Sequence, residues 1–265
     1  MFDLQAPLVD RRQVSRDMHV LRFLGPDIAR GSRPGQFVNL LLRPGPFLRR
    51  PFSVYQTAAD GTFEVLVRAV GVGTAQLLEL EPGESVSALG PLGRGFGLDP
   101  AWNSVALVSG GLGVGPMPLT ARWAMELDLA VTWVHGARSR DDLCRESLGE
   151  VLVATDDGSA GFHGTAVDAV PEGIGAVIGC GPNPMLAAIA ARWPDSQVAV
   201  ETYMGCGTGV CLGCAVPLRS GGYNRACSEG PVYRASEVDW PSLPGKLHYA
   251  HDFAGALGGG WKATA

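Results

Sequence analysis

Four of the six cysteines lie close together in a glycine-rich stretch near the end of the chain. Four residues separate Cys206 from Cys211, two separate Cys211 from Cys214, and twelve more precede Cys227. A C-x4-C-x2-C run followed by a more distant cysteine is typical of plant-type 2Fe–2S sites. The glycines between the cysteines let the backbone wrap closely, and its N–H groups can hydrogen-bond to sulfur. The spacing therefore predicts an iron–sulfur cluster with these four residues as its metal ligands.

Three other kinds of cysteine site fit this stretch less well. Structural zinc sites usually pair C-x2-C with a second short pair, whereas here the first gap is longer and the last cysteine stands alone. A redox dithiol of Cys211 and Cys214 lacks the βαβ context that such motifs have. Disulfides are unusual in the cytoplasm, where we expect this protein because residues 1–4 lack a signal-peptide pattern. Zinc remains the main alternative.

Composition narrows the class of protein. Of the 265 residues, 46% are hydrophobic and 18% are charged, which predicts a globular protein. The net charge of −5 gives no sign of the basic surface that nucleic-acid-binding proteins carry. No apolar run approaches the roughly 18 residues of a membrane span. We therefore expect neither a nucleic-acid partner nor a membrane-spanning segment.

The first hundred residues are rich in short apolar segments of β character. Turn-forming glycine, proline and aspartate separate them. These segments cover residues 19–25, 36–42, 51–57 and 62–70. Several short strands at this spacing predict a small antiparallel barrel or sandwich.

The pattern changes near residue 100, where apolar strands begin to alternate with helices. Expected strands cover residues 104–111, 129–137, 150–158, 175–182 and 197–203, and expected helices follow at 116–128 and 183–193. Such alternation predicts a parallel α/β sheet.

The whole chain is therefore predicted to have a multi-domain α+β fold. We expect an antiparallel β-barrel over residues 1–99, a parallel α/β domain over 100–200 and a cysteine-rich subdomain over 201–235. Residues 236–265 form a tail to which the sequence assigns no role.

Two glycine-rich turns connect strands to helices in the α/β part, at residues 109–116 and 179–186. Glycines there let backbone N–H groups approach a phosphate, and the helix N-terminus favours an anion. The spacing is not the G-x-G-x-x-G fingerprint, so a tight connection explains each turn equally well. Because ligands bind beyond the carboxyl ends of parallel strands, the two turns could face one ligand. Cys180 is either a small buried residue or a nicotinamide contact.

A second group of candidate residues lies in the β-rich part. On the strand at 51–57 and just before it, Arg50 suits a pyrophosphate, and Ser53 suits a ring nitrogen. The glycine turn at 71–77 opens a possible helix and suits a phosphate as well. Taken alone, each signal is weak, because an arginine before a strand is usually a solvated charge.

The order of these motifs is more informative than any one of them. R-P-x-S, G-x-G-T, G-G-x-G-x-G-P and C-G-P-x-P-M-L follow one another along the chain. This order resembles the ferredoxin–NADP reductase superfamily, whose members pair an FAD-binding β-barrel with a nicotinamide-binding α/β domain. Within it, residues 154–168 and the cysteine-rich stretch are most similar to the electron transfer subunits of NAD-linked dihydroorotate dehydrogenases. The resemblance runs from about residue 5 to residue 235.

The resemblance implies three cofactors, namely FAD, a 2Fe–2S cluster and NAD, together with their binding residues. The residues implied to contact FAD are Arg50, Pro51, Phe52, Ser53, Leu66, Val67, Arg68, Gly73 and Thr74. Those implied to contact the nicotinamide nucleotide are Gly110, Gly111, Gly113, Gly115, Cys180, Gly181 and Pro182. Arg138 and Arg140 follow a strand where a 2′-phosphate could bind, but the resemblance favours NAD over NADP.

The resemblance also implies a function in electron transfer. Hydride transfer moves two electrons and an iron–sulfur cluster moves one, so a flavin, which does both, belongs between them. Electrons would pass from the flavin of a separate catalytic subunit through the cluster and FAD to NAD, in pyrimidine biosynthesis. The implied assembly holds two copies of each subunit, and no catalytic acid or base is expected in this chain.

Two alternative functions use the same motifs. One is an NAD(P)H-dependent reductase that serves another acceptor, such as a hydrogenase or an oxygenase. The other, from a different class, is a non-catalytic regulatory protein that binds zinc and a nucleotide.

Overall fold

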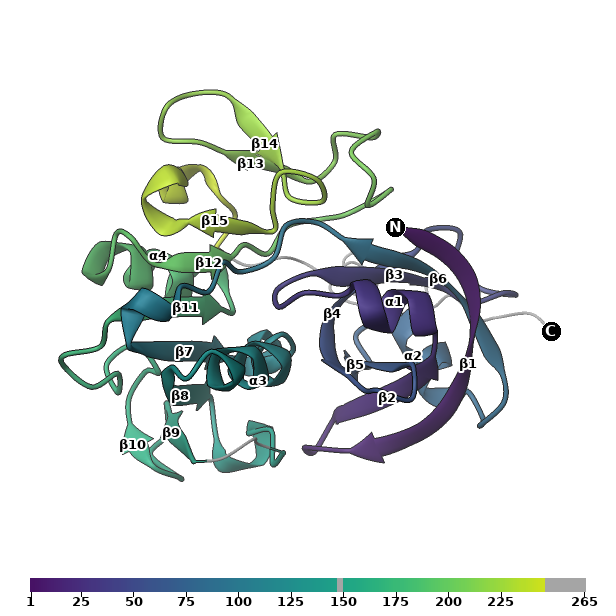
Figure 1. Ribbon diagram of the computed structural model, residues 1–265, viewed down its shortest axis with the longest axis horizontal. Helices are drawn as coiled ribbons and strands as arrows, with labels where there is room; N and C mark the ends of the chain where they lie inside the picture. The colour runs from purple at the N-terminus through teal and green to yellow at the C-terminus, as the bar shows by residue number, and fades with distance from the viewer. Residues whose placement is uncertain (147–149, 246–265) are drawn as a thin grey trace, which may run out of the picture.

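The computed structural model describes residues 1–146 and 150–245, which form three connected parts (Figure 1). The first is a closed barrel with the strand order β1-β2-β5-β4-β3-β6. Its strands are β1 (Phe2–Gln13), β2 (Met18–Leu24), β3 (Phe37–Leu41), β4 (Arg50–Thr57), β5 (Thr62–Arg68) and β6 (Ser85–Leu92). Two short helices accompany them, α1 (Pro26–Gly31) and α2 (Val72–Glu79).

Alternating burial along the strands explains the barrel. In β6 every second residue is buried, so one face of the strand lines the interior. Large apolar side chains, among them Phe23, Val38, Leu40 and Phe63, fill that interior. Closure removes the exposed strand edges that an open sheet would present. The predicted antiparallel barrel is confirmed, and β1 and β6, which the apolar segments did not single out, complete it.

The second part is a seven-stranded sheet with the order β10-β9-β8-β7-β11-β12-β15. Its strands are β7 (Ser104–Gly110), β8 (Ala130–Ala137), β9 (Val151–Thr155), β10 (Phe162–His163), β11 (Ala176–Cys180), β12 (Gln197–Ala199) and β15 (Val232–Arg234). The helices are α3 (Met117–Glu126) and α4 (Asn183–Arg192), with 3-10 turns η1 (Pro100–Trp102), η2 (Gly111–Val114) and η3 (Arg140–Asp142). The strands from β7 to β12 pair in parallel, which confirms the predicted α/β sheet.

The end of this sheet differs from the sequence-based expectation. The strand expected over 197–203 ends at Ala199, because the chain leaves the sheet after the Val200 amide has donated to the Pro231 carbonyl at 2.9 Å. β15 then returns from the cysteine-rich part and pairs antiparallel with β12. The edge strand of the sheet thus belongs to a later segment of the chain.

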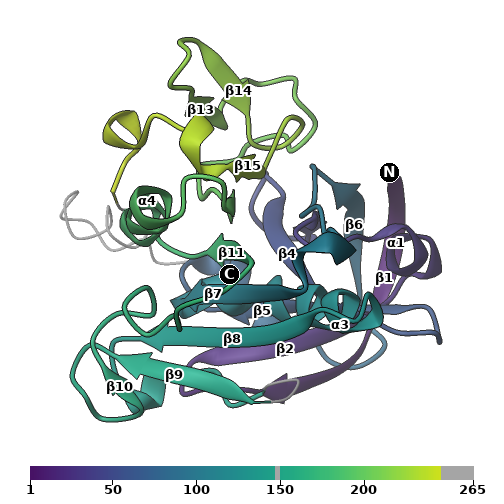
Figure 2. The same ribbon diagram turned by 60° about the vertical axis from the view of Figure 1, so that its left-hand side comes forward.

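The third part holds the four clustered cysteines. It contains the hairpin of β13 (Ala215–Pro217) and β14 (Tyr223–Arg225), with 3-10 turns η4 (Ala235–Glu237) and η5 (Trp240–Ser242). The hairpin lies above the sheet and beside the barrel in both views (Figures 1 and 2). Cys214 and Cys227 share a buried cluster with Phe37 of the barrel. Residues 246–265 of the predicted tail lie outside the described residues.

Apolar side chains join the barrel to the sheet. A buried cluster contains Tyr55 and Leu66 from the barrel together with Leu107 and Met117 from β7 and α3. Arg122 of α3 also donates to the Thr57 hydroxyl at 2.8 Å. In the described ranges no helix is long and apolar enough to cross a membrane.

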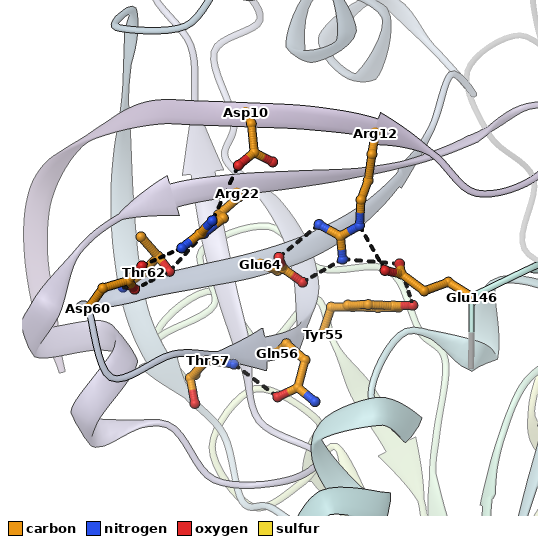
Figure 3. Close-up of polar contacts among 10 residues, drawn as sticks. All are labelled: Asp10, Arg12, Arg22, Tyr55, Gln56, Thr57, Asp60, Thr62, Glu64 and Glu146. Atoms are coloured by element: carbon orange, nitrogen blue, oxygen red, sulfur yellow. Dashed lines mark hydrogen bonds and ion pairs between the residues drawn. The ribbon is translucent and has the colours of Figure 1, made fainter. Parts of the chain in front are cut away.

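A charged network reinforces this joint (Figure 3). The Arg12 guanidinium on β1 donates to both carboxylate oxygens of Glu64 at 2.8 Å and to Glu146, beyond β8, at 2.8 Å. Tyr55 donates its hydroxyl to the same Glu146 carboxylate at 3.2 Å. The hydrogen bonds that Arg12 donates to Glu64 hold the pKa of Arg12 above its usual value, against the opposing effect of burial. Arg12 therefore ties the two parts together through charge-assisted hydrogen bonds.

We predict that Arg12→Gln lowers the free energy of unfolding by about 1–2 kcal/mol, because half-exposed charge pairs contribute modestly. The variant should also increase hydrogen exchange of the amides in residues 140–146. Denaturant titration and exchange mass spectrometry measure the two effects. Arg22→Gln is the matched control, since Arg22 pairs with Asp10 and Asp60, which belong to the barrel and not to the sheet. Equal exchange of 140–146 in both variants would contradict the assignment.

Candidate functional site

Two glycine turns of the sheet part meet each other and the barrel strand β4. A β-carbon on Gly113 would overlap the Cys180 carbonyl oxygen and lie 2.6 Å from the Gly181 nitrogen. A β-carbon on Gly115 would lie 3.6 Å from Cβ of Ser53 on β4. The loops after β7 and β11 and the strand β4 are therefore neighbours, as the two predicted turns and the R-P-x-S motif require for one shared site.

Two adjacent arginines at the start of β4, Arg49 just before the strand and Arg50 as its first residue, have different surroundings. Arg49 donates to Asp3 at 3.1 Å and to the Ser87 hydroxyl at 2.9 Å, so its charge is neutralised within the barrel. Arg50 donates to the Leu48 carbonyl, and no carboxylate among the described residues pairs with it. Burial without such a partner lowers the pKa of Arg50. Arg50 thus presents an uncompensated positive charge that suits a pyrophosphate.

Arg50 lies over the N-terminal end of α2. A β-carbon on Gly73 would lie 2.9 Å from Nε of Arg50, so glycine permits this close approach. The Thr74 hydroxyl accepts from the amides of Val70 and Gly71 at 2.9 and 3.1 Å, which fixes the start of the helix. A helix N-terminus beside a guanidinium is a favourable position for a phosphate. The Thr74 hydroxyl itself is occupied by this capping, which leaves backbone N–H groups for a ligand.

The three candidates on β5 point in different directions. Leu66 lies in the apolar cluster between barrel and sheet, whereas the side chain of Val67 fills the barrel interior. Arg68 forms an ion pair with Asp17 at 3.0 Å. Of the neighbours on β4, Phe52 packs against the barrel core and Pro51 is exposed. A ligand can therefore reach Val67 only through its backbone.

The two glycine turns at residues 109–116 and 179–186, here called the nucleotide turns, are packed against each other through Met185 of α4. A β-carbon on Gly110 would lie 2.7 Å from Sδ of Met185, and one on Gly181 would lie 2.5 Å from its methyl carbon. Pro182 precedes α4 and lies against Gly110 as well. On the other side, Gly111 has φ +53° and open space around it. The turns thus form one surface, with Gly111 on the unobstructed side.

Cys180 is held as a neutral thiol at the end of β11. Burial, with a smaller contribution from the negative charge of Glu201, raises the pKa of Cys180 to about 12. An uncharged thiol does not repel the negative charge of a dinucleotide that binds at this point.

A buried histidine that the sequence did not single out supports the loop after β7. His135 on β8 lies opposite Ser109 on β7, with 3.0 Å between its Nδ1 and the serine hydroxyl. Cys144 donates its amide to Nε2 at 3.3 Å, so the hydrogen-bond pattern assigns the proton to Nδ1. Trp133 donates to the same Ser109 hydroxyl at 3.1 Å. Ser109 immediately precedes Gly110, so this network fixes the start of the glycine loop.

The four clustered thiols lie as two pairs. Cys206 and Cys211 exchange backbone N–H···S bonds at 3.4 and 3.5 Å, and the sulfurs of Cys214 and Cys227 are 3.3 Å apart. Within the described residues, no three His, Cys, Asp or Glu side chains are grouped to hold one metal ion. Two pairs match two irons with two thiolates each better than one tetrahedral zinc.

Backbone N–H groups surround these sulfurs. Thr208 donates to Cys206 at 3.4 Å, and Gly209 donates to Cys227 at 3.1 Å. Burial opposes ionisation of Cys206, but the bonds from Thr208 and Cys211 outweigh it and lower its pKa to about 6. Burial and the neighbouring Cys214 raise the pKa of Cys227 to about 11. Cys206 therefore ionises readily by itself, whereas Cys227 needs a bound metal to become a thiolate near neutral pH.

The surroundings of the sulfurs fit an iron–sulfur cluster. Tyr233 is buried near Cys214 and Cys227, and its hydroxyl has no hydrogen-bond partner among the described residues. A donor in that position suits the sulfur of a cluster. Cys211 is exposed, and the side chains next to it, Val210 and Leu212, are 80% and 64% exposed. One end of the site is thus open to another molecule.

The two arginines after β8 both have partners within this chain. Arg138 pairs with Asp142 at 3.4 Å, and Nε of Arg140 donates to the Ser159 carbonyl at 3.0 Å. Asp142 also pairs with Arg16 at 2.8 Å. The carboxylate offsets the positive charge that a 2′-phosphate would need.

Comparison with protein families matches two parts of the chain. Residues 5–96 match the oxidoreductase FAD-binding domain, and residues 201–239 match the iron–sulfur cluster binding domain of dihydroorotate dehydrogenase B.

Curated relatives cover nearly the whole chain. The dihydroorotate dehydrogenase B (NAD(+)) electron transfer subunit of Geobacillus thermodenitrificans is 36% identical over 247 residues, which are 87% of this chain and 96% of that protein. The corresponding subunit of Desulforamulus reducens is 37% identical over 249 residues, covering 86% and 94%.

Solved structures show the same architecture. The NADH-dependent reduced ferredoxin-NADP oxidoreductase superposes with a TM-score of 0.80 at 31% identity, over 90% of this chain and 91% of that one. Phthalate dioxygenase reductase shares the fold, with a TM-score of 0.58 at 17% identity over 82% and 87% of the two chains.

We predict that Cys211→Ser prevents cluster assembly while FAD stays bound, because the thiolate is lost and the barrel is untouched. Iron and flavin content, the visible spectrum and the EPR signal after reduction measure this. Cys144→Ser, a cysteine outside the cluster loop, should keep both cofactors. A normal cluster EPR signal in the Cys211 variant would rule this residue out as a ligand.

We also predict a pH-dependent stability term from His135. Burial lowers its pKa from 6.5 to about 4, so between these values the unfolded chain binds a proton that the folded protein does not. Stability from this residue is therefore complete above pH 6.5 and falls by about 2–3 kcal/mol as the pH approaches 4.5.

Urea unfolding from pH 7 to 4.5 measures the slope. His135→Gln cannot take up the proton and should flatten the slope, whereas His163→Gln, at an exposed position on β10, should retain it. A slope unchanged by His135→Gln would contradict the assignment.

Proposed function

This chain belongs to the family of dihydroorotate dehydrogenase B electron transfer subunits, and from that premise we propose that it passes electrons from a dihydroorotate-oxidising catalytic subunit to NAD in pyrimidine biosynthesis. The observation that carries the proposal is the arrangement of the cysteine loop. It packs on the wall of the same barrel whose β4 meets the nucleotide turns. The residues proposed for a cluster, a flavin and a nicotinamide thus lie near one another in one chain, which supports the proposal.

The flavin site in this proposal lies between barrel and sheet. Arg50 and the backbone of Gly73 and Thr74 would hold the pyrophosphate of FAD, and Ser53 would contact the ring beside Gly115. FAD held by these residues would supply both two-electron chemistry, as hydride, and one-electron chemistry. The chain itself orients the groups and contributes no acid or base.

The nicotinamide site in this proposal is the surface of the two glycine turns. Gly110, Gly111, Gly113 and Gly115 would place backbone N–H groups along the dinucleotide, opposite the turn of Cys180, Gly181 and Pro182. The pairing of Arg138 with Asp142 supports NAD over NADP.

The cluster site in this proposal consists of Cys206, Cys211, Cys214 and Cys227, which would hold a 2Fe–2S cluster. The N–H groups of Thr208 and Gly209 would stabilise its reduced, more negative state. A cytoplasmic location is part of the proposal, because clustered cysteines in that compartment bind metal more often than they form disulfides.

The catalytic subunit would bind at the exposed end of the cluster loop. Val210 and Leu212 flank the exposed Cys211, and apolar side chains exposed together in this way mark protein contacts. An assembly of two copies of each subunit follows from the family and is part of the proposal.

A general NAD(P)H-dependent reductase is the second candidate. The superposition on an NADH-dependent reduced ferredoxin-NADP oxidoreductase favours it, because the name of that protein gives ferredoxin and NADP and not dihydroorotate. The partner protein distinguishes the two functions.

We predict that mixing this protein with a dihydroorotate dehydrogenase catalytic subunit yields dihydroorotate-dependent NADH formation. A stable complex without such activity would favour the general reductase. Leu212→Glu should weaken the complex by roughly 30-fold, the effect of losing one central apolar contact. Leu152→Glu is the matched control: its side chain is 46% exposed on β9, at the far end of the molecule from β13 and β14 (Figure 2). Calorimetry or surface binding measures both.

A further inference from the structure

Asn39 on β3 of the flavin barrel is a polar side chain that attaches the cluster loop, the stretch that carries Cys206, Cys211 and Cys214. Its Nδ2 donates to the Cys206 carbonyl oxygen at 3.3 Å, although the two residues are 167 positions apart. Asn39 is 1% exposed and lies on the same face of β3 as Phe37, which shares a buried cluster with Cys214 and Cys227. This face of the barrel is therefore the support of the cluster loop.

Gly207 brings the loop into direct contact with this amide. A β-carbon on Gly207 would overlap Nδ2 of Asn39 and lie 3.0 Å from its Cγ. Gly207 also has φ +74°, a conformation that side chains disfavour. The residue between Cys206 and Thr208 thus allows the loop to lie flat on Asn39.

Burying the Asn39 amide costs free energy, and its hydrogen bond to the loop offsets part of that cost. Oδ1 of Asn39 has no hydrogen-bond partner within residues 1–146 and 150–245. A buried, unsatisfied polar atom destabilises a fold, and an apolar residue of similar size would avoid that cost. The hydrogen bond from Nδ2 to the Cys206 carbonyl is the favourable interaction that the buried amide makes.

The backbone of Asn39 is fixed next to the flavin strand. Asn39 pairs with Pro51, and Phe37 pairs with Ser53, so β3 runs directly beside the R-P-x-S motif. Pro51 has no amide N–H, and Arg49 donates to the Asn39 carbonyl oxygen at 3.4 Å. Asn39 is therefore a short connection between the strand of the proposed flavin site and the first proposed cluster ligand.

We infer that Asn39 is a positioning residue that fixes Cys206 and the cluster loop on the wall of the flavin barrel. The inference rests on the proposed function, because it takes Cys206 as a ligand and β4 as the flavin strand. Arg225 holds the same loop from the other side, donating to the Gly209 carbonyl at 3.0 Å, but it belongs to the cysteine-rich part itself. Asn39 thus connects the strand beside the proposed flavin site with the first proposed cluster ligand.

The first test compares Asn39→Leu and Asn39→Asp with wild-type protein carrying its cofactors. Both changes keep the size of the side chain and remove the donor to Cys206. Amide exchange in residues 205–211 and iron loss to a chelator should become roughly five- to tenfold faster, the factor expected for one lost buried hydrogen bond. The EPR line shape of the reduced cluster should also change, whereas flavin content should not. Asn224→Leu, on β14 of the cysteine-rich part, is the control and should behave as wild type.

The second test measures the contact between Asn39 and Gly207. Gly207→Ala should accelerate iron loss more than Gly221→Ala, which has the same left-handed strain, at φ +88°, but open space around it. In an Asn39→Ala background the effect of Gly207→Ala should shrink, because the overlapping amide is gone. Such non-additivity is expected only for residues in contact.

The outcomes separate this inference from the function on which it rests. A wild-type protein without a 2Fe–2S EPR signal would overturn the proposed function. A wild-type protein with that signal, whose Asn39 variants keep its line shape, iron retention and loop exchange, would overturn the role of Asn39 alone. Fully additive effects of Gly207→Ala and Asn39→Ala would overturn it as well.

Discussion

The close backbone approach between the loop after β7 and the turn after β11 is the constraint on which the proposed nicotinamide site depends. Gly113 meets Cys180 and Gly181 with no room for a side chain, and Gly115 reaches Ser53 of the barrel. Any β-carbon at Gly113 would push the turns apart and displace the helix starts behind them. The buried network of Ser109, His135 and Trp133 fixes the residue before Gly110, so it holds the start of the loop in place for this contact.

The cluster loop is held differently, because backbone amides and not side chains donate most of the hydrogen bonds to its sulfurs. Five N–H···S bonds fold the loop around its own sulfurs, and left-handed Gly207 and Gly209 make that path possible. Cys214 and Cys227 are buried against the barrel side, whereas Cys211 is exposed. This polarity gives an electron carrier one insulated end and one end open to a partner.

Three joints keep the parts in register, and they differ in kind. Apolar packing of Tyr55 and Leu66 against Met117 joins barrel and sheet, and Arg12 adds charged bonds to the same joint. The cysteine-rich part is joined by β15, which completes the nucleotide sheet, and by Asn39. Each part therefore depends on contacts with both of the others.

The sequence by itself determined the features that depend on spacing along the chain. The gaps between the four cysteines, the period of the strands and the glycine turns at strand ends predicted the barrel, the α/β sheet and the nature of each site. Only the tertiary structure showed that Arg49 is paired with Asp3 within the barrel, that Val67 faces the barrel interior and that the Thr74 hydroxyl caps a helix, and only it revealed the contacts of His135 and Asn39. The physical reason is range: local spacing sets what a segment can become, whereas the partner of a charge or an amide lies on a distant segment that only the fold brings near.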